Sequence, residues 1–383
     1  MNISEEQLSR WAKAPSETEE GKCQNTINRI TEIVKNKFGN DVSVFLQGSY
    51  RNRTNVRQDS DVDIVVLHKS YYFPDVGGLS ESDKTAYWKN FTESNYTFPQ
   101  FKNDIHALLK DTFGTSMVTR KNKCIRVNGN DYRVNADVVP CFVHKRFCAL
   151  SSVEVEGVEL VSDAGIHIHS FPKQHYDNGV TKNNDTEKMY KSVARILKNI
   201  RNELMGQGTI LPNSMPSFFL ECLVWNVLPN TLFKKSTYTA TTRAVIATIW
   251  NEMREPEKAN NYAEISDLKW LFRGNPNRTH QQALEISQTF SKIFVYAYYE
   301  RSQSESVVAN FAELNSENYL FYTYDSAPNS LKSGAMQAHK GTVKLKYLSN
   351  ENKLIGTYFN SIGNSGEVDF EFEQNALIGR FAK

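Results

Sequence analysis

The 383-residue sequence has little of what marks several broad classes of protein. Its five cysteines are scattered and form no Cys-x-x-Cys pair, which favours a reducing compartment and a cytoplasmic location. Apolar runs stay well short of the roughly 20 residues that span a bilayer, so we expect no membrane partner. The first residues lack the basic and apolar regions of a signal peptide. A net charge of only +2 predicts no large nucleic-acid partner.

The hydrophobic residues, 40% of the chain, suffice for the cores of two or three domains. Their periodicity changes twice. We expect mixed helices and strands over residues 1–184, helices over 185–303, and short antiparallel strands over 307–383, after a polar break at 302–306. Alternating residues in the last part predict a small antiparallel β-barrel or curled sheet, with glycines where the strands bend.

The pattern also predicts individual elements. In the first part we expect helices over 16–38 and 100–113, and strands over 42–46, 61–68, 123–128 and 131–143. In the second part we expect a helix after residue 185 with one apolar and one polar stripe, and further helices over 215–228, 238–255 and 281–301. In the last part the expected strands lie near 343–347, 354–358, 368–372 and 377–381.

Acidic residues beside a Gly-Ser turn form the most informative motif. Asp61 and Asp63 lie in the run Asp-Val-Asp-Ile-Val-Val, so both side chains point to one face of a strand. Neighbouring carboxylates repel each other and favour a cation beside them, and a turn such as Gly48-Ser49 offers N–H groups to a phosphate. Asp137, on a later strand, supplies the third carboxylate that a two-metal site usually needs. The motif predicts magnesium-assisted nucleotidyl transfer.

This order of Gly48-Ser49, Asp61-x-Asp63 and Asp137 resembles the DNA-polymerase-beta-like nucleotidyltransferases. The string Leu-Gln-Gly-Ser-Tyr-Arg-Asn-Arg-Thr-Asn-Val-Arg-Gln-Asp-Ser-Asp-Val-Asp-Ile-Val-Val is similar to the bacterial CD-NTases of clade E, relatives of cyclic GMP–AMP synthase. Further similar motifs are Gln-Leu-Ser-Arg-Trp at 7–11, Ala-Asp-Val-Val at 136–139, Pro-Lys-Gln-His-Tyr-Asp-Asn-Gly at 172–179, Leu-Lys-Asn at 197–199 and Pro-Ser-Phe-Phe-Leu-Glu at 216–221.

The resemblance covers about residues 1–303 and implies an α+β fold. A nucleotidyltransferase core with N-terminal helices would occupy 1–184, and a helical lobe completing the nucleotide cleft would occupy 185–303. The separate all-β domain over 307–383 resembles the nucleotide-sensing β-barrel effectors of bacterial anti-phage systems.

The implied activity is the synthesis of a cyclic di- or trinucleotide second messenger in anti-phage signalling (CBASS). The substrates would be nucleoside triphosphates, with ATP and GTP preferred, and pyrophosphate would leave. The implied cofactor is a pair of Mg²⁺ ions, with Mn²⁺ as a substitute, held by Asp61, Asp63 and Asp137. Asp137 would also help to activate the attacking 3′-hydroxyl. The implied protein partner is an effector or a regulator.

Other residues are implied to bind the nucleotides. Those expected to cradle the donor triphosphate are Gln47, Gly48 and Ser49. Lys198, on the polar stripe of its helix, would reach the triphosphate, and Ser217 would bind phosphate. Phe218 keeps a stacking face for the donor base, with core packing as the alternative. Ser170 lies at the position where some clade-E enzymes carry an asparagine that favours uracil. By the resemblance, a serine at this position implies the use of purine nucleotides. The alternative is a serine with no role in base choice.

Cysteines and histidines raise a weaker question about metal binding. Cys141, His144 and Cys148 lie close together in sequence and invite a zinc site, but no fourth ligand is evident and we favour core packing. His167 and His169 alternate on one strand face and carry the same weak signal.

Two other functions stay open. A linear transferase would add nucleotides to RNA or to a small acceptor, but the near-neutral charge disfavours a large RNA. A nucleotide sensor would carry the front half as a relic of a transferase, but the presence of all three aspartates disfavours a relic.

Overall fold

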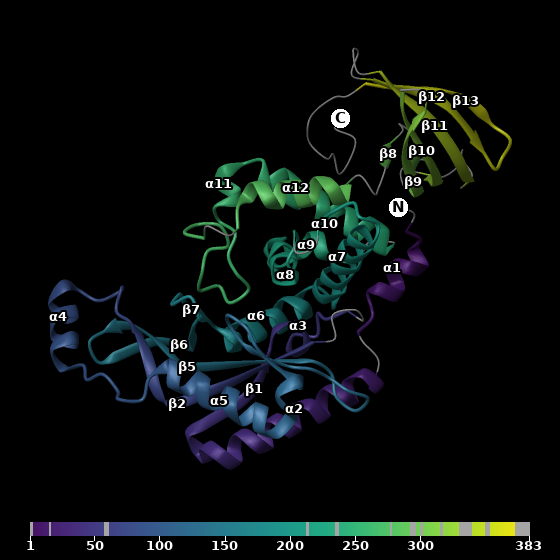
Figure 1. Cartoon of the computed structure of the whole chain (residues 1–383). Coiled ribbons are helices and arrows are strands. Elements are labelled where there is room, and N and C mark those ends of the chain that lie inside the picture. Colours follow the sequence, from purple (N-terminus) through teal and green to yellow (C-terminus); the bar gives the residue numbers. More distant parts are fainter. Residues whose placement is uncertain are drawn as a thin grey trace. The chain divides into compact units, whose positions relative to one another are not determined.

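The computed structural model describes residues 3–14, 17–56, 61–211, 214–233, 237–275, 278–291, 296–298, 302–314, 317–328, 339–348 and 353–371. The chain folds into two compact units, whose elements are labelled in Figure 1. We call residues 14–181 with 264–269 the aspartate unit. Residues 1–13, 182–263 and 270–383 form the helical–sheet unit.

The aspartate unit is built on a seven-stranded sheet with the order β1-β2-β5-β4-β3. The long β5 also pairs with β6 along its second half, and β6 pairs with β7. Only the β2–β5 pair is parallel among these described strands. The bounds are β1 Val42–Gln47, β2 Val62–Asp75, β3 Val118–Arg120, β4 Ile125–Val127, β5 Ala136–Ala149, β6 Ser152–Val161 and β7 His167–Ser170.

Two amphipathic helices, α2 (Glu17–Phe38) and α5 (Phe98–Phe113), share a core with the sheet. Ile30 of α2 and Ile105 of α5 are fully buried together with Ile64 of β2. α5 begins with a capping box in which Thr97 and Gln100 satisfy each other's backbone N–H groups. This packing fixes the central strands β2 and β5. The shorter helices are α3 (Gly48–Arg51), α4 (Glu81–Asn90) and α6 (Pro172–Asp185), the last of which runs on into the other unit.

Most of the expected elements of this unit are confirmed. The helices expected over 16–38 and 100–113 are α2 and α5, although residue 16 lies outside the described residues. The strand expected over 131–143 begins only at Ala136, because Asn130 and Arg133 pair across a turn. It then continues to Ala149, since its second half pairs with β6.

Helices form the first part of the helical–sheet unit. They are α1 Glu5–Trp11, α7 Met189–Gly206, α8 Ser217–Asn226, α9 Pro229–Leu232, α10 Tyr238–Met253, α11 Pro256–Ala259 and α12 His280–Ser291. α1 is tied to this unit because Glu5 accepts hydrogen bonds from the backbone N–H groups of Tyr238 and Thr239, at 2.6 and 2.9 Å. Arg195 donates to the carbonyl of Ala12 at 2.8 Å. The helix expected over 281–301 ends at Ser291, and residues 296–298 belong to a strand instead.

The second part is a six-stranded antiparallel meander with the order β13-β12-β11-β10-β9-β8. The bounds are β8 Tyr296–Tyr298, β9 Ser302–Leu314, β10 Glu317–Pro328, β11 His339–Leu348, β12 Lys353–Asn360 and β13 Ser365–Glu371. Over the described strands β8 and β13 are the two free ends of the order, so the sheet is open. Of the two expected forms, a closed barrel and a curled sheet, the described strands form a sheet that does not close.

The expected polar break at 302–306 is wrong, because these residues are the start of β9 and pair with β10. Backbone ladders do not require apolar side chains, so a polar segment can form a strand. The expected strands near 343–347, 354–358 and 368–372 are β11, β12 and β13, while 377–381 lies outside the described residues. The boundaries expected at 184/185 and 303/307 stay predictions.

Glycines in this sheet make room for neighbouring groups. A Cβ on Gly356 would lie 1.9 Å from the carbonyl oxygen of Lys344, and one on Gly341 would lie 2.4 Å from the ring of Tyr324. Among the side chains that the structure describes here, Tyr324 belongs to the sheet's own buried core, with Leu320, Tyr322, Val343 and Leu345. Among the described helices of the whole chain, none combines the length and apolar character needed to cross a membrane.

Candidate active site

Three carboxylates meet at the ends of two parallel strands in the aspartate unit. Asp61 directly precedes β2, Asp63 is its second residue, and Asp137 is the second residue of β5. The register pairs Asp63 with Asp137 directly across the two strands. Val62, between the first two aspartates, is fully buried on the opposite face. The period-two pattern therefore places the three acidic side chains as the sequence predicts.

Two basic side chains that the sequence analysis missed lie against these carboxylates. Arg126, in β4, stands opposite Asp137, and its Nη1 lies 2.6 Å from Asp61 Oδ2 and 3.3 Å from Asp137 Oδ1. Lys121 Nζ lies 3.4 Å from Asp137 Oδ1. Burial opposes the charge on Arg126, but the hydrogen bond to Asp61 and both carboxylate charges outweigh it and raise the guanidinium pKa. The sequence indicated part of this contact, since Arg126 lies between two apolar residues and so points to the polar face of its strand. The register of β4 with β5 then places it beside Asp137.

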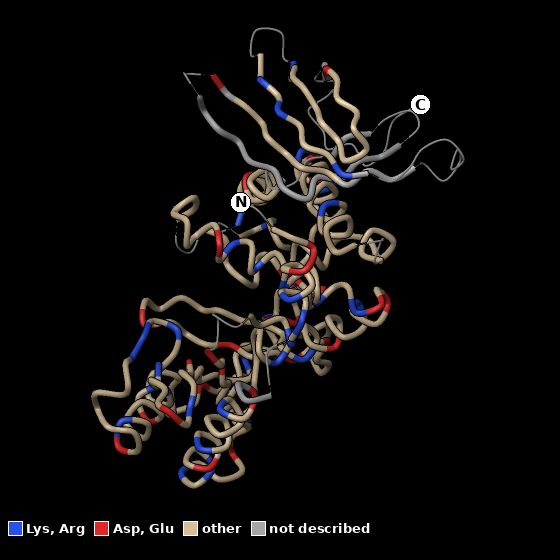
Figure 2. The backbone as a smooth tube through the Cα atoms, turned by 90° about the vertical axis from the view of Figure 1, so that its right-hand side faces the viewer, with Lys and Arg blue, Asp and Glu red and all other residues tan. Residues whose placement is uncertain are grey.

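The donor set fits the implied metal ions. All donors are carboxylate oxygens, the ligands that Mg²⁺ and Mn²⁺ prefer. One guanidinium reaches both Asp61 and Asp137, so these charges converge on one small region that a cation stabilises. Along the rest of the described chain Lys and Arg are interspersed with Asp and Glu (Figure 2).

The Gly-Ser turn approaches the same carboxylates. Gln47, the last residue of β1, pairs with Asp63 across the sheet. Gly48 has a φ of +69°, and a Cβ there would lie 2.2 Å from Asp63 Oδ2. Only glycine allows the chain to turn this close to the acidic group. Ser49 follows in α3, and its carbonyl oxygen accepts a hydrogen bond from the N–H of Thr54 at 2.9 Å. Phosphate binding by these residues stays a prediction.

Ser170 ends β7 and is exposed. Its backbone pairs with Val158 of β6, and a Cβ on Gly157 would lie 2.5 Å from its carbonyl oxygen. The backbone of Ser170 is therefore fixed while its side chain stays accessible, as a role in base choice would require.

The other expected nucleotide residues lie in the helical–sheet unit. Lys198 of α7 is fully buried, and its Nζ lies 2.5 Å from Oε1 of the equally buried Glu221 of α8. Lys198 is therefore not on a solvated helix face, and the expected contact with the triphosphate stays a prediction. Ser217 begins α8 and accepts a hydrogen bond from Arg201 at 2.8 Å. Phe218 is half-buried, with the Arg278 guanidinium 4.7 Å from its ring centre. Contact of these residues with a nucleotide stays a prediction.

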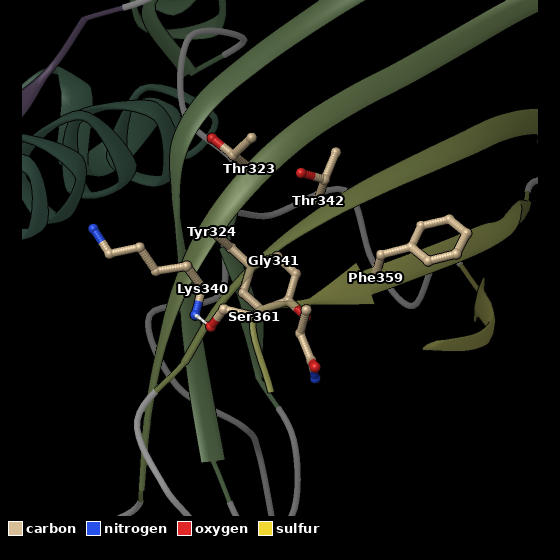
Figure 3. Close-up of a pocket in the computed structure, with 8 residues that line it drawn as sticks. Thr323, Tyr324, Lys340, Gly341, Thr342, Phe359 and Ser361 are labelled. Atoms are coloured by element: carbon tan, nitrogen blue, oxygen red, sulfur yellow. Dashed lines mark hydrogen bonds between the residues drawn. The ribbon is translucent and has the colours of Figure 1, made fainter. Parts of the chain in front are cut away.

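A hollow of about 450 Å³ opens on the C-terminal sheet (Figure 3). Its lining residues come from β10, β11, β12 and the turn after β12: Thr323, Tyr324, Lys340, Gly341, Thr342, Phe359, Asn360 and Ser361. Phe359 is 63% exposed, an unusual state for a large aromatic ring. The backbone of Lys340 is fixed to Ser361, whose Oγ accepts from the Lys340 N–H at 3.1 Å. The hollow is thus lined by a lysine, hydroxyl-bearing residues and an accessible aromatic residue, with the Lys340 amine and the Phe359 ring extending in opposite directions (Figure 3).

Family models match most of the described chain. The nucleotidyltransferase domain matches residues 27–109, and the C-terminal helical domain of cGAS/DncV-like nucleotidyltransferases matches residues 177–295. A cyclic dipurine nucleotide synthase of Elizabethkingia meningoseptica is 50% identical over 288 residues, which are 75% of this chain and 97% of the relative. The chain belongs to the cGAS/DncV-like nucleotidyltransferases. The resemblance seen in the sequence is thereby confirmed.

A solved structure agrees with this assignment. The E. meningoseptica CdnE cyclic dinucleotide synthase, determined with GTP and Apcpp, is 46% identical and has a TM-score of 0.64. The alignment covers 76% of this chain and 98% of that one. The expected α+β architecture of a nucleotidyltransferase core with a helical part is therefore confirmed.

The C-terminal sheet matches a different family. The cyclic dinucleotide receptor domain of Cap15 matches residues 269–373. CD-NTase-associated protein 15 of Staphylococcus schleiferi is 28% identical over 86 residues, which are 22% of this chain and 46% of that protein. The chain therefore combines the synthase fold with a domain similar to a receptor, in agreement with the resemblance of the C-terminal part to nucleotide-sensing effectors.

Proposed function

We propose that this enzyme joins purine nucleoside triphosphates into a cyclic dinucleotide for anti-phage signalling and that its C-terminal sheet binds that product. The observation that carries the synthase activity is the convergence of Asp61, Asp63 and Asp137 beside a glycine turn. Similarity over nearly the full length of a cyclic dipurine nucleotide synthase supports the purine substrates.

In this proposal the protein positions and activates two nucleotides in turn. Asp61 and Asp63 hold two Mg²⁺ ions, and Asp137 helps to hold the second. When bound, the ions lower the pKa of the 3′-hydroxyl and neutralise charge on the triphosphate. Asp137 orients the 3′-hydroxyl and takes up its proton, and the hydroxyl oxygen bonds to the α-phosphorus as the bond to pyrophosphate breaks. Repetition of this step between the same two nucleotides closes the ring.

The remaining residues of the site would select and orient the donor. The N–H groups of Gly48 and Ser49 face the phosphates, and Gln47 supports them from the end of β1. Ser170 leaves room for a bicyclic base, and its hydroxyl serves purine acceptors. By the family resemblance, Phe218 stacks on the donor base and Ser217 contacts its triphosphate. The same role for Lys198 would require its amine to leave the buried pair with Glu221.

The hollow on the sheet has the chemistry that a cyclic dinucleotide requires. Such a ligand carries two phosphates and two aromatic bases, and ligand pockets usually measure about 300–1,000 Å³. Lys340 supplies a positive charge, Thr342 and Ser361 supply hydroxyls, and Phe359 supplies a stacking face. We therefore place the product at this hollow.

Incubation of the full chain with each labelled triphosphate and Mg²⁺, followed by thin-layer chromatography and mass spectrometry, tests the synthase. We expect a cyclic dipurine product, which the folded double variant Asp61→Asn with Asp63→Asn should not make. A linear product extended on RNA would support the linear transferase instead. No product from any triphosphate would support a sensor with a relic core.

Product binding is tested separately by calorimetry with purified cyclic dinucleotides. Lys340→Glu and Phe359→Ala should each weaken binding at least tenfold and leave the synthesis rate unchanged. Thr357→Glu, an exposed position of β12 outside the hollow, is the charge control. Unchanged binding by both pocket variants would place the receptor site elsewhere without affecting the synthase proposal.

A further inference from the structure

The motif Pro-Lys-Gln-His-Tyr-Asp-Asn-Gly at 172–179 has no part in the proposed chemistry, yet it contacts the helix that carries the Gly-Ser turn. It forms the start of α6, which lies beside α3 (Figure 1). His175 Nε2 lies 2.8 Å from Nδ2 of Asn52, the residue directly after α3. The guanidinium carbon of Arg51 lies 4.0 Å from the ring centre of Tyr176. Two consecutive residues of the motif therefore meet two consecutive residues at the end of α3.

The short helix α3 depends on such contacts for its position. It is a single turn of four residues, and a helix of this length is not stable by itself in water. Left-handed residues, Gly48 with φ +69° and Arg53 with φ +54°, mark where the chain turns into it and out of it. The Asn52 side chain is 6% exposed, so its amide needs hydrogen-bond partners within the protein. An amide nitrogen donates and does not accept, so His175 Nε2 is the acceptor of this bond.

The other partner in this contact, α6, is fixed within the aspartate unit. The backbone N–H of His175 donates to the carbonyl of Phe171 at 2.9 Å, and Phe171 is buried where β7 passes into the helix. Asn178, also in the motif, donates to the carbonyl of Ile265 at 2.9 Å. The motif therefore connects α3 to parts of the unit that are already packed.

The strand that leads into α6 is held by histidines. Both oxygens of the buried Glu159 in β6 accept hydrogen bonds from histidine Nδ1 atoms, those of His144 in β5 and His167 in β7, each at 2.6 Å. These groups satisfy one another and tie β7 to its neighbours, so the start of α6 is well supported. Of the two cysteines expected to pack in the core nearby, Cys141 is buried and Cys148 is exposed.

We propose that His175 is a positioning residue for nucleotidyl transfer: through Asn52 it holds α3, and with it the Gly48-Ser49 turn, against the three aspartates. Tyr176 adds a second tie, because the Arg51 guanidinium is attracted to the face of its aromatic ring. The inference rests on the proposed function, since it takes the turn to face the phosphates of the donor.

Loss of this tie should affect the transition state more than substrate binding. The backbone groups of the turn stay available to the phosphates, so the donor still binds. Its α-phosphorus is no longer held in line with the attacking 3′-hydroxyl, and a misplacement of about 1 Å costs about 100-fold in rate. An interaction that serves only the transition state appears in kcat rather than in KM. The expected signature is therefore a fall in kcat with little change in KM.

The test measures kcat and KM of full-length variants for ATP and GTP from pyrophosphate release, corrected for the folded fraction seen by circular dichroism. His175→Ala should lower kcat by about 10–100-fold and leave KM within about threefold. His175→Phe keeps a ring but no acceptor and should show the same loss. His175→Gln, whose amide oxygen can accept from Asn52, should recover most of the rate, a rescue that a role in packing alone would not give. Lys173→Ala is the matched control in the same motif, since this exposed side chain pairs with Asp177 of its own helix at 2.7 Å, and it should keep wild-type kinetics.

Variants at the other end of the contact complete the test. Asn52→Ala should lower kcat as His175→Ala does, and the double variant should lose little more than either alone, because both substitutions remove the same contact. The inference is overturned if His175→Ala or His175→Phe keeps the wild-type kcat, if only KM changes, or if Lys173→Ala loses as much. A wild type that forms no product from any triphosphate would instead overturn the proposed function, and this inference with it.

Discussion

Replacing Gly48 by alanine should disable catalysis at a small cost in stability. The backbone at Gly48 is left-handed, with φ +69°, where a side chain costs roughly 1–2 kcal/mol. The new Cβ would lie 2.2 Å from Asp63 Oδ2, whereas ordinary contacts begin at 3.4 Å. The carboxylate must therefore move by roughly 1 Å, and a misplacement of this size costs about 100-fold in rate. We expect kcat/KM to fall about 100-fold, equivalent to about 2.7 kcal/mol of transition-state stabilisation.

The matched control is Gly39→Ala. Gly39 has a similar left-handed φ of +59°, but a Cβ there meets nothing within 4 Å. Both variants carry the backbone penalty, so each should lower the Tm by a few degrees. Only Gly48→Ala displaces the carboxylate, so only it should lose synthesis, measured as pyrophosphate release from ATP and GTP. Activity of Gly48→Ala within threefold of Gly39→Ala would refute the assignment of Asp63 to the metal site.

Three other substitutions test separate parts of the structure. Ser170→Asn should raise the use of UTP and CTP in the chromatographic assay, and a wild-type product made mainly of UMP would show the purine assignment to be wrong. Glu221→Gln should lower the free energy of unfolding in urea by about 3–5 kcal/mol, because Lys198 loses its buried partner; a loss below 1 kcal/mol would contradict this pairing. Arg126→Gln should bind Mn²⁺ alone more tightly in calorimetry, whereas Arg120→Gln, whose side chain pairs with Asp163 and not with the three site aspartates, should not. Equal affinities would argue against competition between Arg126 and the metal.

Strand periodicity was enough to predict the acidic site. Alternation placed Asp61 and Asp63 on one face, and a third carboxylate was expected on a neighbouring strand. The parallel pairing of β2 with β5 then brings Asp137 opposite Asp63. The alternation depends on local sequence and can be read without coordinates, whereas the register that sets Asp137 opposite Asp63 comes from the structure.

The partners of these groups could not be predicted in the same way. Lys198 lies at a position that helical periodicity assigns to a polar stripe, but the stripe is covered in the fold and the charge is paired with Glu221. Glu159 meets His144 only because β5, β6 and β7 adopt one particular register. Such contacts join segments far apart in sequence, and a pattern within one segment carries no information about them. For the same reason the alternating strands after residue 307 could not distinguish an open sheet from a closed one.

The charges around the aspartates suggest why metal and nucleotide should bind together. Three carboxylates at the ends of adjacent strands repel each other, and in the absence of metal Arg126 and Lys121 offset that repulsion. A Mg²⁺ ion arriving alone must compete with these cations for the same oxygens. A triphosphate changes the balance, because its negative charge offers Arg126 a bidentate partner as the metal takes the carboxylates. The affinity for the metal ion should therefore rise when the nucleotide is present. Arg126→Gln should show a similar rise in metal affinity without nucleotide, because the competing guanidinium has been removed.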